Sequence, residues 1–266
     1  MSRRDGSLLA DIERDALDDR VPLASVLRKC IALGTQTRNA ELRDWASQEL
    51  SGYRDDDSAI PPYRIIYAPL TVDGANIRFQ ISGEQISATD LPEVAHGKIS
   101  EEVPFAQGVG DLEALVRNTA RAGKTSVMLS PPGAADLVKL MNYERHDQGS
   151  LVSRLYWDVH IGRVEGILDH IRTTLVRLTS EIRASMPRDT SMPTSEQTAQ
   201  AINVVLHGGR RNHVTVTTAQ AGDSGTAEVV PPQVESHWTR TQTIWTIVGV
   251  LVAVVGAYFA YRQWRG

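Results

Sequence analysis

Cysteine is almost absent from this chain of 266 residues, which contains a single one, Cys30. One cysteine excludes an intramolecular disulfide and a zinc site built from several thiolates. Cys30 lies at helical spacing among apolar residues such as Val26 and Leu27. We therefore expect a small buried core residue and not a reactive nucleophile.

The chain also lacks an excess of positive charge. It has 28 basic and 32 acidic residues, a net charge of −4 and a sequence pI near 6.0. Proteins that bind nucleic acid usually present a basic face or stripe, so we predict no nucleic-acid partner. Hydrophobic residues make up 41% of the chain, which is enough to build a sizeable core.

Motifs that carry chemistry are missing as well. The seven histidines include no H-E-x-x-H pattern, and no Gly-x-Ser-x-Gly occurs. Gly123-Lys124-Thr125 matches the end of a phosphate-binding loop, but Asn118 stands where that motif needs a glycine. We predict no catalytic, cofactor-binding or metal-binding residues and a protein that is not an enzyme. An enzyme with a site hidden in the α/β part is a less favoured alternative.

Long apolar runs are rare, and one is long enough to cross a bilayer. Residues 243–261 carry no charge, and Arg240 and Arg262 flank them. At ~1.5 Å per residue such a helix reaches about the 30 Å of a hydrocarbon core. Tryptophan and tyrosine gather at both ends, as in an aromatic belt. The sequence predicts a single C-terminal transmembrane helix over residues 241–262.

This predicted span has a face of small residues. Thr246, Gly249, Ala253, Gly256 and Ala260 follow spacings of three and four. Small residues on one face let transmembrane helices approach closely and pack. The face therefore predicts association between spans. Small residues are common in spans, so a segment that serves only as an anchor remains the alternative.

The first residues show no apolar segment and no cleavage site of a secretory signal peptide. We therefore expect a tail-anchored, single-pass protein with its soluble N-terminal body in the cytoplasm.

The fold class that we predict is α+β. Residues 1–54 predict a helical unit, in which Pro22 begins the second helix, Asn39 caps the third and Gly52 ends it. Residues 61–157 alternate β-prone and helical segments and predict a mixed α/β body.

In that body we expect strands over 63–67 and 75–81, with a turn near Asp73-Gly74, and a strand over 126–129. Helices are expected over 111–121 and 134–141.

Residues 160–186 predict one long heptad-patterned helix that completes the body, residues 1–186. Its apolar residues alternate spacings of three and four. They are Ile161, Val164, Leu168, Ile171, Leu175, Leu178 and Ile182. Packing within the same chain is the favoured interpretation, and a self-association seam between copies is the alternative.

After Pro187 the composition shifts to Ser, Thr, Pro, Gln and Gly, which predicts a flexible linker over 187–240. Within it, residues 202–218 are β-prone on both sides of Gly208-Gly209 and predict a short hairpin or β-arch. An isolated hairpin is only marginally stable in water, so this island would not form a domain alone.

Several segments of the chain resemble the AbiTii domain. They are residues 7–12, 26–31, 40–45, 49–53, 61–64 and 165–172. The resemblance extends over about residues 5–185 and consists of packing and capping residues, so it transfers no active site. It implies a role in bacterial abortive infection or related conflict systems.

These observations predict a membrane-anchored component of a bacterial anti-phage, abortive-infection-like defence system at the inner membrane. The favoured mechanism is a non-enzymatic effector that acts through self-association in the bilayer. Its expected partners are the lipid bilayer, further copies of the chain as a homo-oligomer, and a protein of the same defence system. The alternative is a membrane-tethered adaptor or scaffold that recruits a partner protein. No cofactor is expected.

Overall fold

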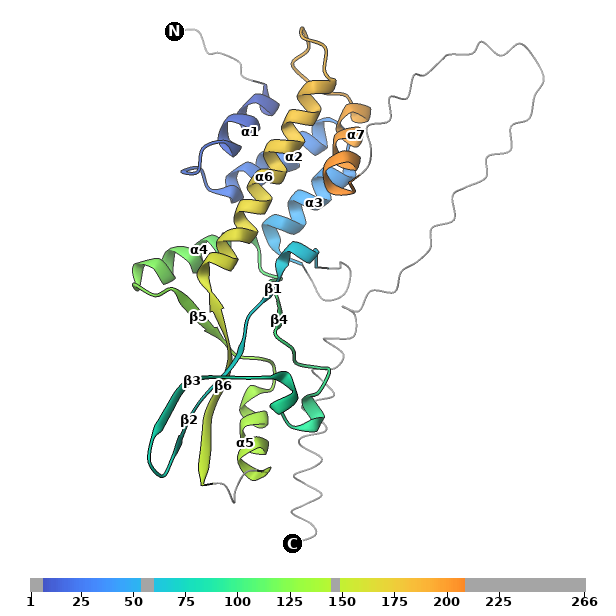
Figure 1. Ribbon diagram of the computed structural model, residues 1–266. Coiled ribbons are helices and arrows are strands. Elements are labelled where there is room, and N and C mark those ends of the chain that lie inside the picture. Colours follow the sequence, from blue (N-terminus) through green and yellow to red (C-terminus); the bar gives the residue numbers. More distant parts are fainter. Residues whose placement is uncertain (1–6, 54–59, 145–148, 209–266) are drawn as a thin grey trace, which may run out of the picture.

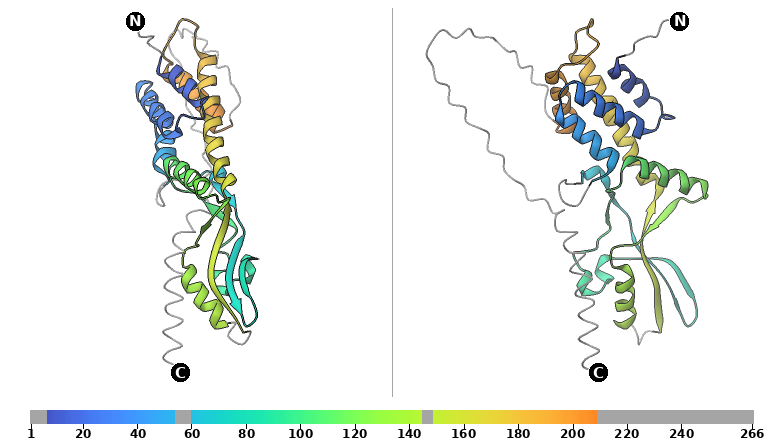
Figure 2. Two further views of the ribbon diagram at one scale, coloured as in Figure 1. Left: turned by 90° about the vertical axis from the view of Figure 1, so that its left-hand side faces the viewer. Right: turned by 180° about the vertical axis from the view of Figure 1, so that it is seen from behind.

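The computed structural model describes residues 7–53, 60–144 and 149–208. Seven α-helices and two antiparallel sheets are found in these ranges, as expected for an α+β protein. The molecule is elongated, with most helices at one end and a four-stranded sheet at the other (Figures 1 and 2).

The helical part lies at one end of the molecule. It is built from the first three helices of the described chain and from the last two. It contains the following helices: α1 (Leu8–Ala16), α2 (Leu23–Gln36), α3 (Ala40–Ser51), α6 (Ile161–Ser185) and α7 (Ser195–Leu206). The shorter helix α4 (Val109–Arg121) packs on α2, α3 and α6 from the side of the sheets.

Three helices, α1, α2 and α3, lie in the range where the sequence predicts a helical unit. Pro22 is the N-cap residue of α2, and the Asn39 side chain accepts a hydrogen bond of 2.8 Å from the Leu42 N–H. Gly52 ends α3 with φ at +93°, where a Cβ atom would lie 2.6 Å from the Ala106 carbonyl oxygen. Local capping signals therefore set these helix ends.

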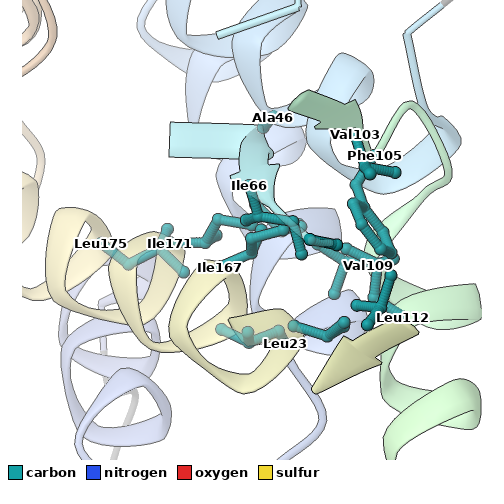
Figure 3. Packing of buried hydrophobic residues seen from close by; sticks show 14 of the residues in the cluster. Leu23, Ala46, Ile66, Val103, Phe105, Val109, Leu112, Ile167, Ile171 and Leu175 are labelled. Atoms are coloured by element: carbon teal, nitrogen blue, oxygen red, sulfur yellow. The ribbon is translucent and has the colours of Figure 1, made fainter. Parts of the chain in front are cut away.

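One apolar cluster connects the helical part to the nearby strands (Figure 3). Its centre is the inner face of α6, which packs against α1, α4 and α7. The cluster includes Leu23, Ile66, Phe105, Val109, Ile167 and Ile171, each of which is at most 9% exposed. The two ends of the molecule thus share a continuous core.

Two antiparallel sheets follow the helical part. The small one pairs β1 (Ile65–Tyr67) with β4 (Glu102–Pro104). The larger has the order β3-β2-β6-β5. Its strands are β2 (Leu70–Asn76), β3 (Gln80–Ile86), β5 (Ser126–Leu129) and β6 (Ser150–His160).

Helix α5 (Ala134–Glu144) packs against β6, and together with the four-stranded sheet it forms the sheet part of the molecule. Short 3₁₀ helices, η1 (Pro62–Arg64), η2 (Ala88–Asp90) and η3 (Glu93–Ala95), occupy the connections.

The prediction of a turn near Asp73-Gly74 is wrong. Strand β2 continues through both residues to Asn76, and the chain turns between Asn76 and Gln80. Gly74 lies at a register shift in the pairing with β3 and β6. A Cβ atom there would lie 2.4 Å from the Leu151 carbonyl oxygen, so the glycine permits a close approach of two strands.

The structure also differs from the predicted linker, because residues 195–206 form α7. Thr194 and Gln197 form a capping box at its start, and Ile202 is fully buried. The β-prone residues at its end are helical because the helix packs against α6 and α3. Tertiary packing has overridden local propensity here. The rest of the predicted β-prone island, residues 209–218, lies outside the described residues.

Within the part of the chain that the structure describes, no helix combines the length and apolar character of a membrane span. The predicted span over 241–262 lies outside this part. So does its small-residue face, Thr246, Gly249, Ala253, Gly256 and Ala260.

Candidate functional site

The heptad residues of α6 lie in the core of their own chain. Val164, Ile171, Leu175, Leu178 and Ile182 are each at most 1% exposed. Ile161 and Leu168 are half-buried against the same cluster. In this chain the seam is therefore covered by the protein's own helices. Self-association through the seam would require α6 to separate from α1, α4 and α7.

A buried pair of opposite charges joins the helical part to the sheets. Glu49 lies in the last turn of α3 and Arg64 in η1, and both side chains are 0% exposed. Arg64 Nη2 lies 2.6 Å from Glu49 Oε2, and Arg64 Nε donates to the same oxygen at 3.2 Å. Charge-assisted hydrogen bonds of this kind are among the strongest in proteins.

Further partners complete the surroundings of this pair. Arg64 Nη1 donates to the carbonyl oxygens of Phe105, at 3.0 Å, and Gln107, at 2.8 Å. The hydroxyls of Tyr53 and Tyr63 both donate to Glu49 Oε1. Among the described residues, no buried side-chain nitrogen or oxygen lacks a hydrogen-bond partner. We call Glu49, Tyr53, Tyr63 and Arg64 the buried junction.

The electrostatics of the buried junction favour a structural role. Burial, and then the negative charge of Glu49, raise the pKa of Tyr53 and of Tyr63. Both phenols therefore stay protonated and act as donors, not as bases. The Tyr63 ring also stacks on the His170 ring at 4.2 Å between centroids, which adds a contact to α6. The junction ties α3, η1, α6 and the segment after β4 together.

A second polar cluster links three strands of the four-stranded sheet, β2, β3 and β6. Asp73 in β2 accepts hydrogen bonds from the Gly83 N–H at 2.9 Å and the Tyr156 hydroxyl at 3.1 Å. Arg154 Nη2 lies 3.0 Å from its other oxygen. These partners lower the pKa of Asp73, the Gly83 hydrogen bond most strongly. The carboxylate stays charged and connects β2 to both of its neighbours.

The free end of the sheet carries exposed apolar side chains. Ile77 is 92% exposed, and Phe79 and Leu151 are each 65% exposed. We call these three residues the hairpin tip, because they lie at the turn between β2 and β3 and on the adjacent start of β6. Sequence reasoning missed it because the turn was placed at residues 73–74, so that Ile77 and Phe79 were expected inside a strand.

Two smaller predictions are confirmed. Cys30 is fully buried, and burial raises its pKa to about 12, so it is a core residue. Gly123 follows the last turn of α4 with φ at +65°, as expected for a helix stop and not for a phosphate loop. In the described ranges, no group of three His, Cys, Asp or Glu side chains is arranged to hold a metal ion.

The family model for AbiTii matches residues 7–207. The chain belongs to the AbiTii family. The match begins with α1 and ends just after α7, so it covers the buried junction, both sheets and the hairpin tip. Membership in AbiTii indicates a protein related to abortive infection and defence. No curated protein and no solved structure matches the chain.

Proposed function

We propose that this AbiTii protein is a membrane-anchored, non-enzymatic effector of bacterial anti-phage defence, with its folded body in the cytoplasm. One pairing of observations carries the proposal. The AbiTii match ends at residue 207, and an uncharged run with the length of a membrane span follows at 243–261. An AbiTii body would thereby be held at the inner membrane.

The chemistry of the body supports action without catalysis. A general acid or base must come within hydrogen-bond reach of its substrate. Glu49 and Arg64 have no exposed side-chain surface, and Tyr53 and Tyr63 direct their hydroxyls at Glu49. The buried thiol of Cys30 stays protonated at neutral pH. These groups hold the body together and offer a substrate no reactive atom.

Self-association is assigned to the span and not to α6. The heptad seam is occupied by the protein's own core. The run at 243–261 presents Gly249, Ala253 and Gly256 on one face, where close packing of helices is possible. In this proposal a signal sensed by the body leads the spans to associate, and the bilayer becomes permeable.

Dye entry into cells expressing the full chain during phage infection tests this proposal. We expect entry with the natural sequence and a loss of entry for Gly249→Leu and Gly256→Leu. Val254→Leu is the matched control, because residue 254 would lie outside the small-residue face of the predicted helix. All variants should remain in the membrane fraction. Intact membranes under every infection condition would contradict the effector proposal.

The alternative is a membrane-tethered adaptor that recruits a partner protein. The predicted linker favours it, because a flexible segment over residues 209–240 would transmit little mechanical force between body and span. Crosslinking of the full chain in membranes separates the two proposals. Self-crosslinks that require residues 241–262 support the effector. Crosslinks to a second protein, formed equally by the Gly249→Leu variant, support the adaptor.

A further inference from the structure

The hairpin tip is apolar, exposed and structurally defined. The Asn76 side-chain oxygen accepts hydrogen bonds from the backbone N–H groups of Arg78, at 2.9 Å, and Phe79, at 2.8 Å. These bonds fix the turn, with Ile77 at 92% exposure on one side of Arg78 and Phe79 at 65% on the other. Leu151 extends the surface from β6, opposite Ala75. Exposed apolar surface gathered at one end of a molecule usually marks an interaction site.

The turn of the hairpin itself carries one charged residue, Arg78. Residues 74–83 and 149–153 contain no aspartate or glutamate, whereas Arg78 lies exposed between the two apolar turn residues and Arg154 lies on β6. Arg154 is paired with Asp73. Arg78 is therefore the cation placed to meet an anionic surface at the end of the hairpin. An apolar tip with a basic residue suits the boundary between headgroups and acyl chains.

The size and position of the tip favour a membrane over a protein partner. Three side chains are too few for a stable protein interface, which buries about 800 Å² per partner. A membrane needs no such area, because shallow insertion of a few aromatic and aliphatic side chains adds to an existing anchor. The tip also lies at the end of the molecule opposite the helical part, beside the end of α5 (Figures 1 and 2).

We propose that Ile77, Phe79 and Leu151 insert into the headgroup region of the membrane in which the C-terminal run is anchored, with Arg78 against anionic lipid phosphates. The inference rests on the proposed membrane anchoring and adds an orientation to it. The sheet part faces the bilayer and the helical part faces the cytoplasm. The buried junction lies between these two parts. The body then has two membrane attachments, one on each side of residues 209–240.

An environment-sensitive fluorophore on residue 79 tests the proposal. The full chain with Phe79→Cys is reconstituted in vesicles of phosphatidylcholine and phosphatidylglycerol and labelled; the unsubstituted protein reports any labelling of buried Cys30. We expect a blue-shifted emission that lipid-attached nitroxides quench at least twofold. Leu17→Cys is the matched control, because Leu17 is 66% exposed but lies in the helical part. Its label should emit as in water.

A second variant guards against effects of the label itself. With Ile77→Ser and Phe79→Ser together, a fluorophore at Leu151→Cys should lose its quenching, while carbonate washing leaves the protein in the vesicles. A water-like signal at residue 79 in anchored protein would overturn the inference and leave the anchoring proposal standing. Equal quenching at residues 17 and 79 would overturn it too. Release of every variant by carbonate would overturn both proposals.

Discussion

Arg64 and Glu49 form an ion pair with no exposed side-chain surface, and Arg64 Nη2 lies 2.6 Å from Glu49 Oε2. The pair joins the end of the helical unit to the first residues that lead into the sheets. Taking two charges out of water is costly, so such a pair contributes little net stability compared with apolar residues. Replacing only one of the two residues should nevertheless destabilise the fold strongly, because the remaining charge is then buried without a counter-ion.

We predict that Arg64→Met lowers the free energy of unfolding by about 3–5 kcal/mol, because Glu49 then stays buried without its counter-ion. Urea unfolding of the detergent-solubilised full chain, followed by circular dichroism, measures the loss. Arg20→Met is the control, because its side chain is 93% exposed, and it should change stability by less than about 0.5 kcal/mol. The double variant Glu49→Leu, Arg64→Met should recover part of the loss, and a purely additive result would contradict this explanation.

Arg172 fastens α6 to the end of α1. Its Nη1 donates to the carbonyl oxygens of Ala16, at 3.2 Å, and Asp18, at 3.1 Å, and its Nη2 donates to Val21 at 2.9 Å. Lysine keeps the charge but lacks the planar fork, so we predict that Arg172→Lys costs about 1.5–3 kcal/mol.

Faster amide exchange in α1 should accompany this loss of stability. Arg183→Lys is the matched control, because Arg183 lies on the same helix, is 40% exposed, and reaches Glu13 of α1 at 3.6 Å. Unchanged exchange in α1 of the Arg172→Lys protein would show that these bonds do not hold the helix.

Two glycines should respond in opposite directions to alanine. Gly74→Ala places a methyl group against the Leu151 carbonyl and should destabilise the sheet by about 1–3 kcal/mol. Gly166→Ala lies in α6 with no atom within 4 Å of the new Cβ and should stabilise by about 0.5–1 kcal/mol. Thermal unfolding of the two variants side by side measures both effects, and equal signs would contradict the close strand approach at Gly74.

The lowered pKa of Asp73 predicts that the folded protein loses stability in acid. The Gly83 N–H, assisted by Tyr156 and Arg154, holds the pKa of Asp73 below its ordinary value of 3.8. The unfolded chain therefore takes up this proton more readily than the folded one. The stability that the ionised Asp73 contributes is fully present above the pKa that Asp73 has in the unfolded chain. It is lost as the pH falls through the lower pKa that Asp73 has in the folded protein. The difference in unfolding free energy between the natural protein and Asp73→Asn should be constant at neutral pH and shrink below about pH 4. A difference that is independent of pH from 7 to 2.5 would contradict the prediction.

The helical unit could be predicted from sequence because its signals are local. Asn39 and Gly52 act on backbone groups within a few residues, and the period of the apolar residues selects one face of each helix. The same reasoning located β5 at 126–129 and the extent of α6 to within a residue or two. It failed at Gly74, where the reason for the glycine is the Leu151 carbonyl on a strand about eighty residues away.

The sequence by itself determined the helices before residue 187, the burial of Cys30 and the membership that the AbiTii match shows, because these depend on short-range periodicity and on residue types in order. Only the tertiary structure decided that the heptad face of α6 is filled by its own chain, that residues 195–206 are helical, and that Glu49 meets Arg64. It also decided that Ile77 and Phe79 end a hairpin in solvent. Each of these depends on contacts between distant segments, and the free energy of such contacts is absent from any local pattern.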